Sequence, residues 1–521
     1  MTSDKDVEYV EEVKQIDSSS KLDEKATKNL FKTLKESFNL TMALSSLLLI
    51  CSSFSHGFDN QGFATIQAMD SFTEKFGEYN VRTGVYAIPP KFLSYLNSFQ
   101  YIGFAFGLVC GSIVSSRFGR KICVLSMSLY ALITATIAIT SDSKEQILSA
   151  RVLNYVFIGM EMAVIPVFQA EIVPPKTRGF FVGAFQLSLA IGGLIIHIIT
   201  NSTAHIHGTS SWRIPLGLYY IFPSIIASLI MFVPESPRWL ILKGKNEEAM
   251  QSLVRLRSGT ILESEIPDEF ESIISSVEVE KQHGSKYTEL FTGTNKRRTI
   301  LVILANTFQQ VTGQAFSSQY GTIFIKSLHT VDPFQMSIVS SVINIVGVAI
   351  VLLFTDAFGR KKFLVVGSVI QAMALLAMGG LGTGDITTAK KKGVVATMMI
   401  NGFAYCISWA PLSYVISSEI PTPRLRDKTY AVGILFNILF AFLTAFTLPY
   451  LLSKPYANLQ SKVGFIYGAF TVLAIVFSYF LPECHGLSLE EIELNFVNNV
   501  PLNRFSKNPQ QSKDDGELYT P

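Results

Sequence analysis

Long apolar runs that lack charged residues recur along the chain, separated by polar segments. Two of the clearest are ICVLSMSLYALITATIAIT (122–140) and MSIVSSVINIVGVAIVLLFT (336–355), each about 20 residues long. At a rise of about 1.5 Å per residue, a helix of that length spans a hydrocarbon core about 30 Å thick. A helix on the surface of a soluble protein would be shorter and would show one polar face. The pattern therefore predicts helices that cross a membrane.

Twelve segments follow this pattern, which predicts an all-α membrane protein with twelve transmembrane helices. The polar stretches predict a cytosolic N-terminal tail (1–41), an N-terminal six-helix half (42–233), a cytosolic helical linker (234–298), a C-terminal six-helix half (299–482) and a cytosolic C-terminal tail (483–521). The expected spans are 42–64, 93–114, 122–140, 148–170, 180–200, 214–233, 299–325, 336–355, 363–382, 393–418, 431–452 and 463–482.

Three short motifs occur twice along the chain, in the same order and at nearly the same spacing. Each copy lies at the same end of an equivalent span in the two halves, so the chain is predicted to contain two parallel, pseudo-symmetric six-helix repeats. Parallel repeats of this kind form the major facilitator fold, in which substrate lies near the membrane midplane and the halves rock around it. The pairs are SRFGRK (116–121) with DAFGRK (356–361), EIVPPKTRG (171–179) with EIPTPRLRD (419–427), and PESPR (234–238) with PECHG (482–486).

Composition supports a membrane protein and argues against several other classes. Hydrophobic residues make up 49% of the chain and charged residues 16%, and the mean hydropathy is +0.35. The net charge of +3 is too small to indicate nucleic-acid binding. The five cysteines include no CxxC pair, so we expect neither disulfide nor metal chemistry. Nucleophile–base spacings and phosphate-binding loops are also missing from the sequence, which predicts a protein that is not an enzyme and needs no cofactor.

Basic residues gather in the loops at one end of the predicted spans. Because short cytosolic loops are enriched in lysine and arginine, this end is predicted to face the cytosol together with both termini, although the lysines at 390–392 lie on the other side. Asn201 would then face outward as a candidate glycan acceptor. We expect a monomeric multi-pass protein of the plasma membrane.

The repeated motifs also predict a cytosolic latch that closes and opens as the halves rock. Glycine allows a tight turn in each FGRK copy, and the basic side chains can reach carboxylates at neighbouring helix ends. The carboxylates recur with the basic residues, which favours a latch over residues that only anchor topology. The candidate latch residues are Glu171 and Glu419 as the natural acidic partners, Glu235 as a third, and Arg117, Arg120, Arg178, Arg238, Asp356, Arg360 and Arg426.

The motifs resemble those of the sugar porter family of the major facilitator superfamily over nearly all of residues 42–492. The segment SWAPLSYVISSEI (408–420) is similar in particular to the tenth span of fungal hexose transporters. The resemblance implies a carrier for a sugar or related polyol that works in the lipid bilayer by alternating access. A sugar sensor with the same fold is an alternative, although such receptors have long cytosolic extensions. The motifs that carry the resemblance are Gly57-Phe58-Asp59, GSIVSSRFGRK, Arg151, PVFQAEIVPPKTRG, PESPRWL, FQQVTG, DAFGRK and PECHGLSLEE.

The resemblance also implies that amide side chains bind the substrate. An amide offers a donor and an acceptor to a sugar hydroxyl, and a buried amide without a partner is costly. Each amide could instead only hold helices together. Ala315 stands where the family has an asparagine that glucose carriers use, and Gln319 stands for a tyrosine, which leaves glucose itself open. The candidate substrate contacts are Gln186, Gln309, Gln310, Asn344 and Asn437, with Tyr320 and Tyr414 lining the site.

Asp59 and Arg151 are predicted to lie at a similar depth near the outer boundary of the membrane, where they can meet. A nearby arginine favours the charged form of a carboxyl group and separation favours the protonated form, which is what proton uptake and release require. The resemblance agrees, because proton-coupled sugar porters use a carboxylate here with this arginine. The alternative is a facilitator with a purely structural ion pair. Glu161 and His197 are further ionisable residues within spans, and Glu161 is a candidate for either a second titrating group or a buried neutral acid.

Overall fold

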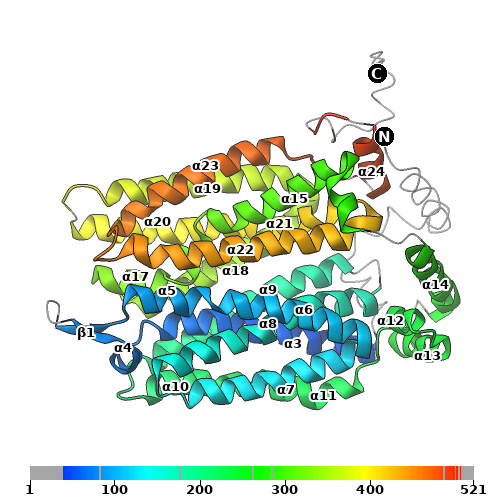
Figure 1. Cartoon of the computed structure of the whole chain (residues 1–521), viewed down its shortest axis with the longest axis horizontal. Coiled ribbons are helices and arrows are strands. Elements are labelled where there is room, and N and C mark those ends of the chain that lie inside the picture. The colour runs from blue at the N-terminus through cyan, green and yellow to red at the C-terminus, as the bar shows by residue number, and fades with distance from the viewer. Residues whose placement is uncertain are drawn as a thin grey trace.

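Two bundles of helices lie side by side along the long axis of the molecule, the N-terminal bundle in blue to teal and the C-terminal bundle in green to orange (Figure 1). The structure is a computed structural model. Most of the expected tails (1–41 and 483–521) lies outside the residues that it describes. The described residues are 39–80, 84–174, 178–260, 263–282, 286–385, 387–484, 487, 489–498, 500–502 and 505.

The first bundle follows the apolar runs that predict spans one to six. Short breaks divide two of these spans into consecutive helices, and a small antiparallel hairpin of two strands lies between the first and second spans. In chain order the elements are α3 (Leu40–Ile66), α4 (Asp70–Phe76), β1 (Glu78–Asn80), β2 (Val85–Ala87), α5 (Pro90–Ser98), α6 (Gln100–Phe118), α7 (Arg120–Ile139), α8 (Lys144–Ile172), α9 (Arg178–Thr203), α10 (Ser210–Gly217), η3 (Leu218–Tyr220), α11 (Ile221–Leu229) and η4 (Ile230–Phe232).

The second bundle repeats the pattern after a segment of short helices, and the chain closes with one more short helix. The linking elements are α12 (Pro237–Leu242), α13 (Asn246–Arg257), η5 (Glu263–Glu265), α14 (Ile266–Gln282) and η6 (Tyr287–Phe291). The bundle itself comprises α15 (Gly293–Val311), α16 (Gln314–Ser318), α17 (Gly321–Leu328), α18 (Pro333–Phe358), α19 (Arg360–Leu381), α20 (Thr388–Cys406), α21 (Trp409–Glu419), η7 (Pro423–Leu425), α22 (Arg426–Leu452), η8 (Gln460–Lys462) and α23 (Val463–Phe480), followed by α24 (Leu489–Val497).

Within the described residues, eleven helical segments are long and apolar enough to cross a membrane. The remaining expected span (299–325) is divided into α15, α16 and α17. Gly313 makes the first break, since its φ of +87° lies in the left-handed region that favours glycine. With this broken helix counted, the arrangement is the twelve-helix major facilitator fold, which confirms the predicted fold class.

Two hydrophobic cores are centred in each bundle, and one core of each takes in a residue of the other bundle, Phe334 and Leu93 respectively. In the first, one core gathers around Phe157 and Phe168 of α8, and a second gathers around Trp212 of α10. In the second, one core surrounds Trp409 of α21, and another surrounds Phe316 of α16. The apolar residues left exposed lie mostly on the long helices, as expected for surfaces that face lipid.

Close contact between α6 and α8 depends on glycines spaced one turn apart. A Cβ atom added at Gly103 would lie 1.9 Å from the carbonyl oxygen of Val152, and one added at Gly107 would lie 2.1 Å from that of Val156. Small residues at such spacing let two membrane helices approach closely. This contact fixes the position of α8, which carries Arg151 and Glu161.

Replacing Gly107 with valine should therefore force α6 and α8 apart and destabilise the folded protein by at least about 1–3 kcal/mol, the usual cost of overpacking. Gly380→Val is the matched control, because a Cβ atom there meets nothing within 4 Å. Thermal melting of the purified proteins in detergent is the measurement. Equal melting temperatures for the two variants would show that the close contact is not needed.

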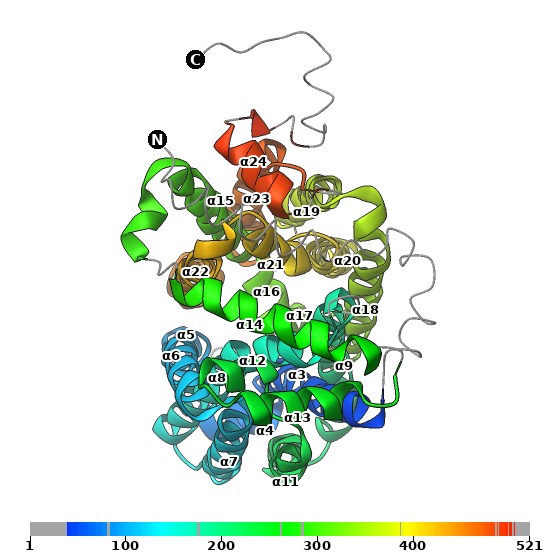
Figure 2. The ribbon, with the colours of Figure 1, turned by 90° about the vertical axis from the view of Figure 1, so that its right-hand side faces the viewer.

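Helices α12, α13 and α14 cover one end of the bundles, which we call the linker end (Figure 2). Arg257 of α13 is 1% exposed, donates to the carbonyl oxygen of Ile172 at 2.9 Å and makes two hydrogen bonds to Glu269. This arginine therefore ties the linker to the end of α8. The opposite end, which carries α4 and the β1–β2 hairpin, is called the far end (Figure 1).

Candidate functional site

The repeated motifs form two equivalent ion pairs at the linker end. In the first bundle, Arg120 at the start of α7 makes two hydrogen bonds of 2.9 Å to Glu171 near the end of α8. In the second, Arg360 at the start of α19 donates to the Glu419 carboxylate at the end of α21 at 3.0 Å. The repeat in the sequence is thus a repeat in structure. Each pair joins two helices of one bundle, so neither pair by itself bridges the two bundles.

Glu235 was expected to pair with a basic side chain, but among the described residues its carboxylate bonds to backbone amides. It accepts from the backbone amides of Arg120 at 3.1 Å and Lys121 at 3.2 Å, so it caps the first turn of α7. An acidic group is stabilising there because the amides at a helix N-terminus are unpaired and carry partial positive charge. Burial raises the pKa of the Glu235 carboxyl, and the amides that it accepts from oppose that rise.

Glu483 plays the same part in the second bundle and was missed by the sequence analysis. It accepts from the backbone amides of Arg360 at 3.2 Å and Lys361 at 3.0 Å. The signal was present, because PECHG repeats the Pro-Glu of PESPR. Gly119 and Gly359 precede the two capped helices with φ of +104° and +88°, which explains why both motifs need glycine at this position.

Five other residues were predicted to take part in the latch. Arg117 is exposed, and its guanidinium lies over the ring of Phe118. Arg238 in α12 and Arg426 at the start of α22 are half-buried. The side chains of Arg178 and Asp356 lie outside the described residues.

Removing the charged partner in the second bundle should destabilise the protein measurably. Arg360→Ala breaks a partly buried pair with Glu419, for which we expect a loss of about 1–2 kcal/mol, between the values for exposed and buried pairs. Arg117→Ala, at an exposed position three residues before Arg120 in the first motif, should change stability by less than about 0.5 kcal/mol. Thermal melting compares the two, and a larger loss for Arg117→Ala would contradict the assignment.

Three of the five predicted amides lie together between α15 and α22. Gln309 is 2% exposed and donates to the carbonyl oxygen of Ala410 at 3.3 Å. Asn437 donates to the Gln309 amide oxygen and accepts from the Gln310 amide nitrogen, the latter at 3.0 Å. We call Gln309, Gln310 and Asn437 the amide cluster. The three side chains hold each other in place through hydrogen bonds. A sugar hydroxyl could replace one of these bonds, because a hydroxyl group can both donate and accept.

Further polar groups lie close to the amide cluster. Asn306, one turn before Gln309 on α15, accepts through its backbone oxygen from Asn437 and donates to the Ser417 hydroxyl at 2.7 Å. Sequence reasoning missed Asn306, whose only signal was an amide on the same helix face. Tyr414 interacts with Gln309 through its hydroxyl group. A tyrosine hydroxyl beside the cluster adds one more donor and acceptor for a sugar.

The remaining predicted contacts are separate from the cluster. Asn344 on α18 is half-buried, and its buried amide oxygen accepts no hydrogen bond from the described residues. Gln186 on α9 is half-buried. Tyr320 is 1% exposed and donates to the carbonyl oxygen of Ala445 at 2.8 Å, so its hydroxyl is occupied in holding α17 to α22.

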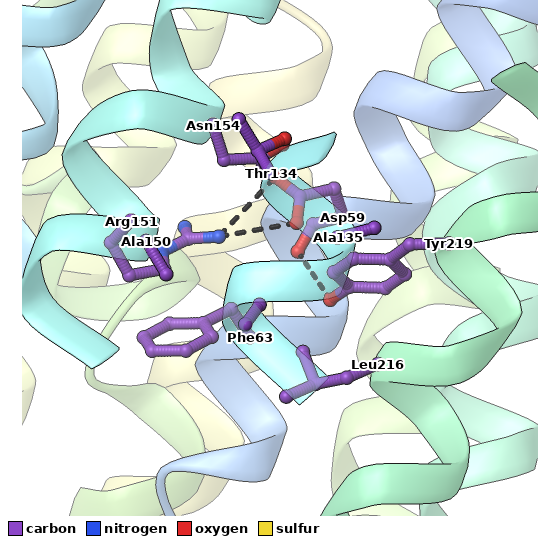
Figure 3. Close-up of a pocket in the computed structure, with 10 residues that line it drawn as sticks. Asp59, Phe63, Thr134, Ala135, Ala150, Arg151, Asn154, Leu216 and Tyr219 are labelled. Carbon is purple, nitrogen blue, oxygen red and sulfur yellow. Dashed lines mark hydrogen bonds and ion pairs between the residues drawn. The ribbon is translucent and has the colours of Figure 1, made fainter. Parts of the chain in front are cut away.

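Asp59 and Arg151 meet inside the first bundle, where Asp59 comes from α3 and Arg151 from α8 (Figure 3). One guanidinium nitrogen lies 3.1 and 3.2 Å from the two carboxylate oxygens. Asn154 donates to the same carboxylate at 2.8 Å, and Arg151 donates to the Gln100 amide oxygen at 2.9 Å. Each member of the pair is 4% exposed, so the two charges compensate each other away from solvent.

Aromatic side chains complete this environment. The Arg151 guanidinium lies 3.9 Å from the ring centre of Phe63 and 4.9 Å from that of Tyr155. Tyr219 donates to the backbone oxygen of Asp59 at 3.1 Å, and Figure 3 shows Tyr219, Phe63 and the ion pair around a small cavity. The rings fix the guanidinium from its faces and leave its edge for the carboxylate.

Contacts towards the far end hold the two bundles together. His197 of α9 bonds to the hydroxyl of Ser341 of α18 at 2.6 Å, and Ser94 of α5 donates to the carbonyl oxygen of Phe446 of α22, also at 2.6 Å. In addition, Gln319 donates to the Tyr101 hydroxyl at 2.7 Å. His197 thus has a contact between bundles that its sequence position did not reveal.

An ion pair adds to this closure at the far end. Lys326 of α17 lies 2.6 Å from the carboxylate of Asp70, which opens α4. Aromatic rings of α5 and α22 also stack between the bundles, with the centroids of Tyr95 and Phe446 6.3 Å apart. The described structure is therefore one in which the far ends of the bundles are packed against each other.

Comparison with known proteins gives matches over most of the chain. The sequence profile of the family described as sugar (and other) transporter matches residues 44–496. Hexose transporter HXT9 of Saccharomyces cerevisiae is 29% identical over 482 residues, which cover 88% of this chain and 83% of that protein. The low-affinity glucose transporter of Kluyveromyces lactis is 28% identical over 484 residues, with the same two shares.

Solved structures share the fold. The proton:xylose symporter XylE, a major facilitator superfamily protein, matches with a TM-score of 0.70 and 21% identity, covering 88% of this chain and 100% of that chain. The inward open conformation of XylE from E. coli gives the same score over 87% of this chain. Identity this low supports the fold alone, whereas the profile match extends over most of the chain. The chain belongs to the sugar (and other) transporter family of the major facilitator superfamily.

Proposed function

We propose that the protein carries a sugar or a related polyol across a membrane by alternating access, in symport with a proton. The observation that supports coupling is the buried ion pair between Asp59 and Arg151. Relatives named as hexose transporters and a fold neighbour named as a proton:xylose symporter favour the same substrate class and the same coupling.

The amide cluster supports a hydroxylated substrate. Gln309, Gln310 and Asn437 offer donors and acceptors between α15 and α22, with the Tyr414 hydroxyl beside them. The unpartnered amide oxygen of Asn344 is a further acceptor for a hydroxyl proton. A substrate without hydroxyl groups would leave these buried groups poorly satisfied, which costs about 1–3 kcal/mol for each group. Gln186 and Tyr320 complete the proposed set of lining residues.

The Asp59–Arg151 pair supplies the coupling step. While the guanidinium faces the carboxylate, the charged form of Asp59 is favoured, and separation of α3 from α8 favours the protonated form. A neutral carboxyl group can then cross the rocking transition without an uncompensated charge in the membrane. Proton binding and helix movement are thereby linked.

The ends of the molecule fit the proposed topology. The linker end, with its two capped and paired FGRK turns, would face the cytosol together with both termini, and the far end would face outward. Residues 42–233 and 299–482 would act as the two halves that rock. The described contacts at the far end then correspond to a state closed to the outside. We place the protein in the plasma membrane as a monomer.

Uptake by cells that lack their own sugar transporters tests this function. A panel of radiolabelled hexoses, pentoses, disaccharides and polyols would be offered at two external pH values, with and without a protonophore. We expect one class to accumulate, faster at acidic pH, and to lose accumulation with the protonophore. Uptake that equilibrates regardless of pH would identify a facilitator, and binding without uptake would identify a sensor.

A further inference from the structure

A second buried acid–base pair lies one turn from Asp59, towards the linker end. His56 precedes Asp59 by one turn on α3, and its Nδ1 atom lies 3.3 Å from a carboxylate oxygen of Glu161 on α8. Glu161 is 0% exposed and lies in the middle of the helix. No part of the coupling step described above uses either residue.

Polar atoms around this pair lack the partners that buried groups usually have. Within the described residues, neither Glu161 carboxylate oxygen nor His56 Nδ1 takes part in a well-formed hydrogen bond. The hydroxyl group of Ser53, one turn further along α3, is also buried and unpartnered, and the buried Ser52 hydroxyl interacts with the Glu161 carboxyl group. Buried polar groups are normally satisfied, so this group of four residues needs an explanation other than packing.

The charges near the pair are few and can be named. On α3 the charged neighbour is Asp59, and on α8 it is Arg151; these two neutralise each other. His56 is the charged group that acts on Glu161 among the described residues. A bare carboxylate in this place would be very costly. The pair is therefore neutral when it holds one proton, either on Glu161 or as an imidazolium beside the carboxylate.

We propose that His56 and Glu161 form a second proton-binding site, which receives the proton from Asp59 and passes it towards the linker end. The coupling role rests on the proposed symport. The two residues would bind a proton even in a protein that does not couple.

The transfer balances in protons and charge. The protonated Asp59 gives its proton to neutral His56, and the resulting carboxylate pairs again with Arg151. Glu161, until then neutral, releases its own proton past the hydroxyl groups of Ser52 and Ser53 towards the linker end. An imidazolium beside a carboxylate remains, and movement of its proton to Glu161 restores the starting state. One proton enters and one leaves.

Infrared spectroscopy of the purified protein tests whether the site binds a proton. Between about pH 5 and 8, the range in which histidine changes its charge, wild type should show a protonated-carboxyl band that changes with pH. Asp59 is a second buried carboxyl group, so the comparison is made in an Asp59→Asn background, where adding Glu161→Gln should remove the remaining band and adding His56→Gln should shift the pH dependence of that band. Glu145→Gln, an exposed position in the first turn of α8, should leave the band unchanged. A wild-type spectrum without a titrating buried carboxyl would overturn the proposal.

Flux measurements in liposomes test the transfer itself. Glu161→Gln should lower sugar-driven proton flux by on the order of 100-fold, the usual contribution of a positioned proton-transfer group, while exchange of labelled for unlabelled sugar continues. Proton flux equal to that of wild type would exclude Glu161 from the path. If wild type moves sugar without protons, the proposed symport is wrong, and the proposed proton transfer through Glu161 is wrong as well. The infrared titration then decides the proton site independently.

Discussion

Replacing Asp59 with asparagine should abolish accumulation of sugar against its gradient and leave downhill flux or exchange measurable. Asparagine keeps the size of the side chain and resembles the protonated carboxyl group, so the cycle can proceed without binding or releasing a proton at this position. Arg151 then has no charge to pair with, and we also expect slower turnover because an uncompensated guanidinium remains buried. Accumulation ratios in transporter-deficient cells are the measurement.

Asp142→Asn is the matched control for this experiment. Asp142 lies at the far end, paired with Lys75 and Arg213, and its side chain is 68% exposed. Removing its charge should leave accumulation unchanged. An Asp59→Asn variant that accumulates sugar as well as wild type would contradict a coupling role for the buried pair. Loss of exchange as well as accumulation would show that Asp59 is needed for the conformational cycle and not specifically for proton coupling.

Replacing Gln309 with alanine should weaken the apparent affinity for sugar by roughly 5- to 150-fold, which corresponds to about 1–3 kcal/mol for a lost buried hydrogen bond. The variant removes a proposed substrate contact and also leaves the Asn437 amide without its acceptor on Gln309. The half-saturation constant for uptake is the measurement, with surface expression checked in parallel. Gln335→Ala, an exposed glutamine in the first turn of α18, should leave the constant unchanged.

A double replacement distinguishes the amide cluster from independent contacts. Because Gln309 and Asn437 bond to each other, losses from Gln309→Ala and Asn437→Ala should not add in the double variant. Asn344→Ala, on α18, should add more nearly to Gln309→Ala. Unchanged half-saturation in both Gln309→Ala and Asn344→Ala would remove these residues from the substrate site.

The sequence predicts features that depend on local pattern or on repetition. Apolar length predicts the membrane spans because a hydrocarbon core demands one helix length. The repeated motifs predict that Arg120 and Arg360 lie beside Glu171 and Glu419, since equivalent positions in two similar halves have equivalent neighbours. The contact between Asp59 and Arg151 could be predicted because the two residues lie at similar depths in their spans.

Other features depend on contacts that no pattern in one sequence encodes. Glu235 was expected to meet arginine side chains, but it meets backbone amides, because the turn at Gly119 points the start of α7 at it. The partner of Glu161 is His56 on another helix, and the rotation of the two helices decides that contact. The break at Gly313 was also missed, since a single glycine within an apolar span is compatible with an unbroken helix.

Proton movement driven by sugar in a purified system tests the central claim most directly. The protein would be sealed into liposomes that contain a pH-sensitive dye, and sugar would be added outside with no pH gradient and no membrane potential. Proton symport predicts acidification of the interior that depends on sugar, disappears with a protonophore and is missing from the Asp59→Asn variant. Entry of radiolabelled sugar to equilibrium with no change in internal pH would contradict the account and identify the protein as a facilitator.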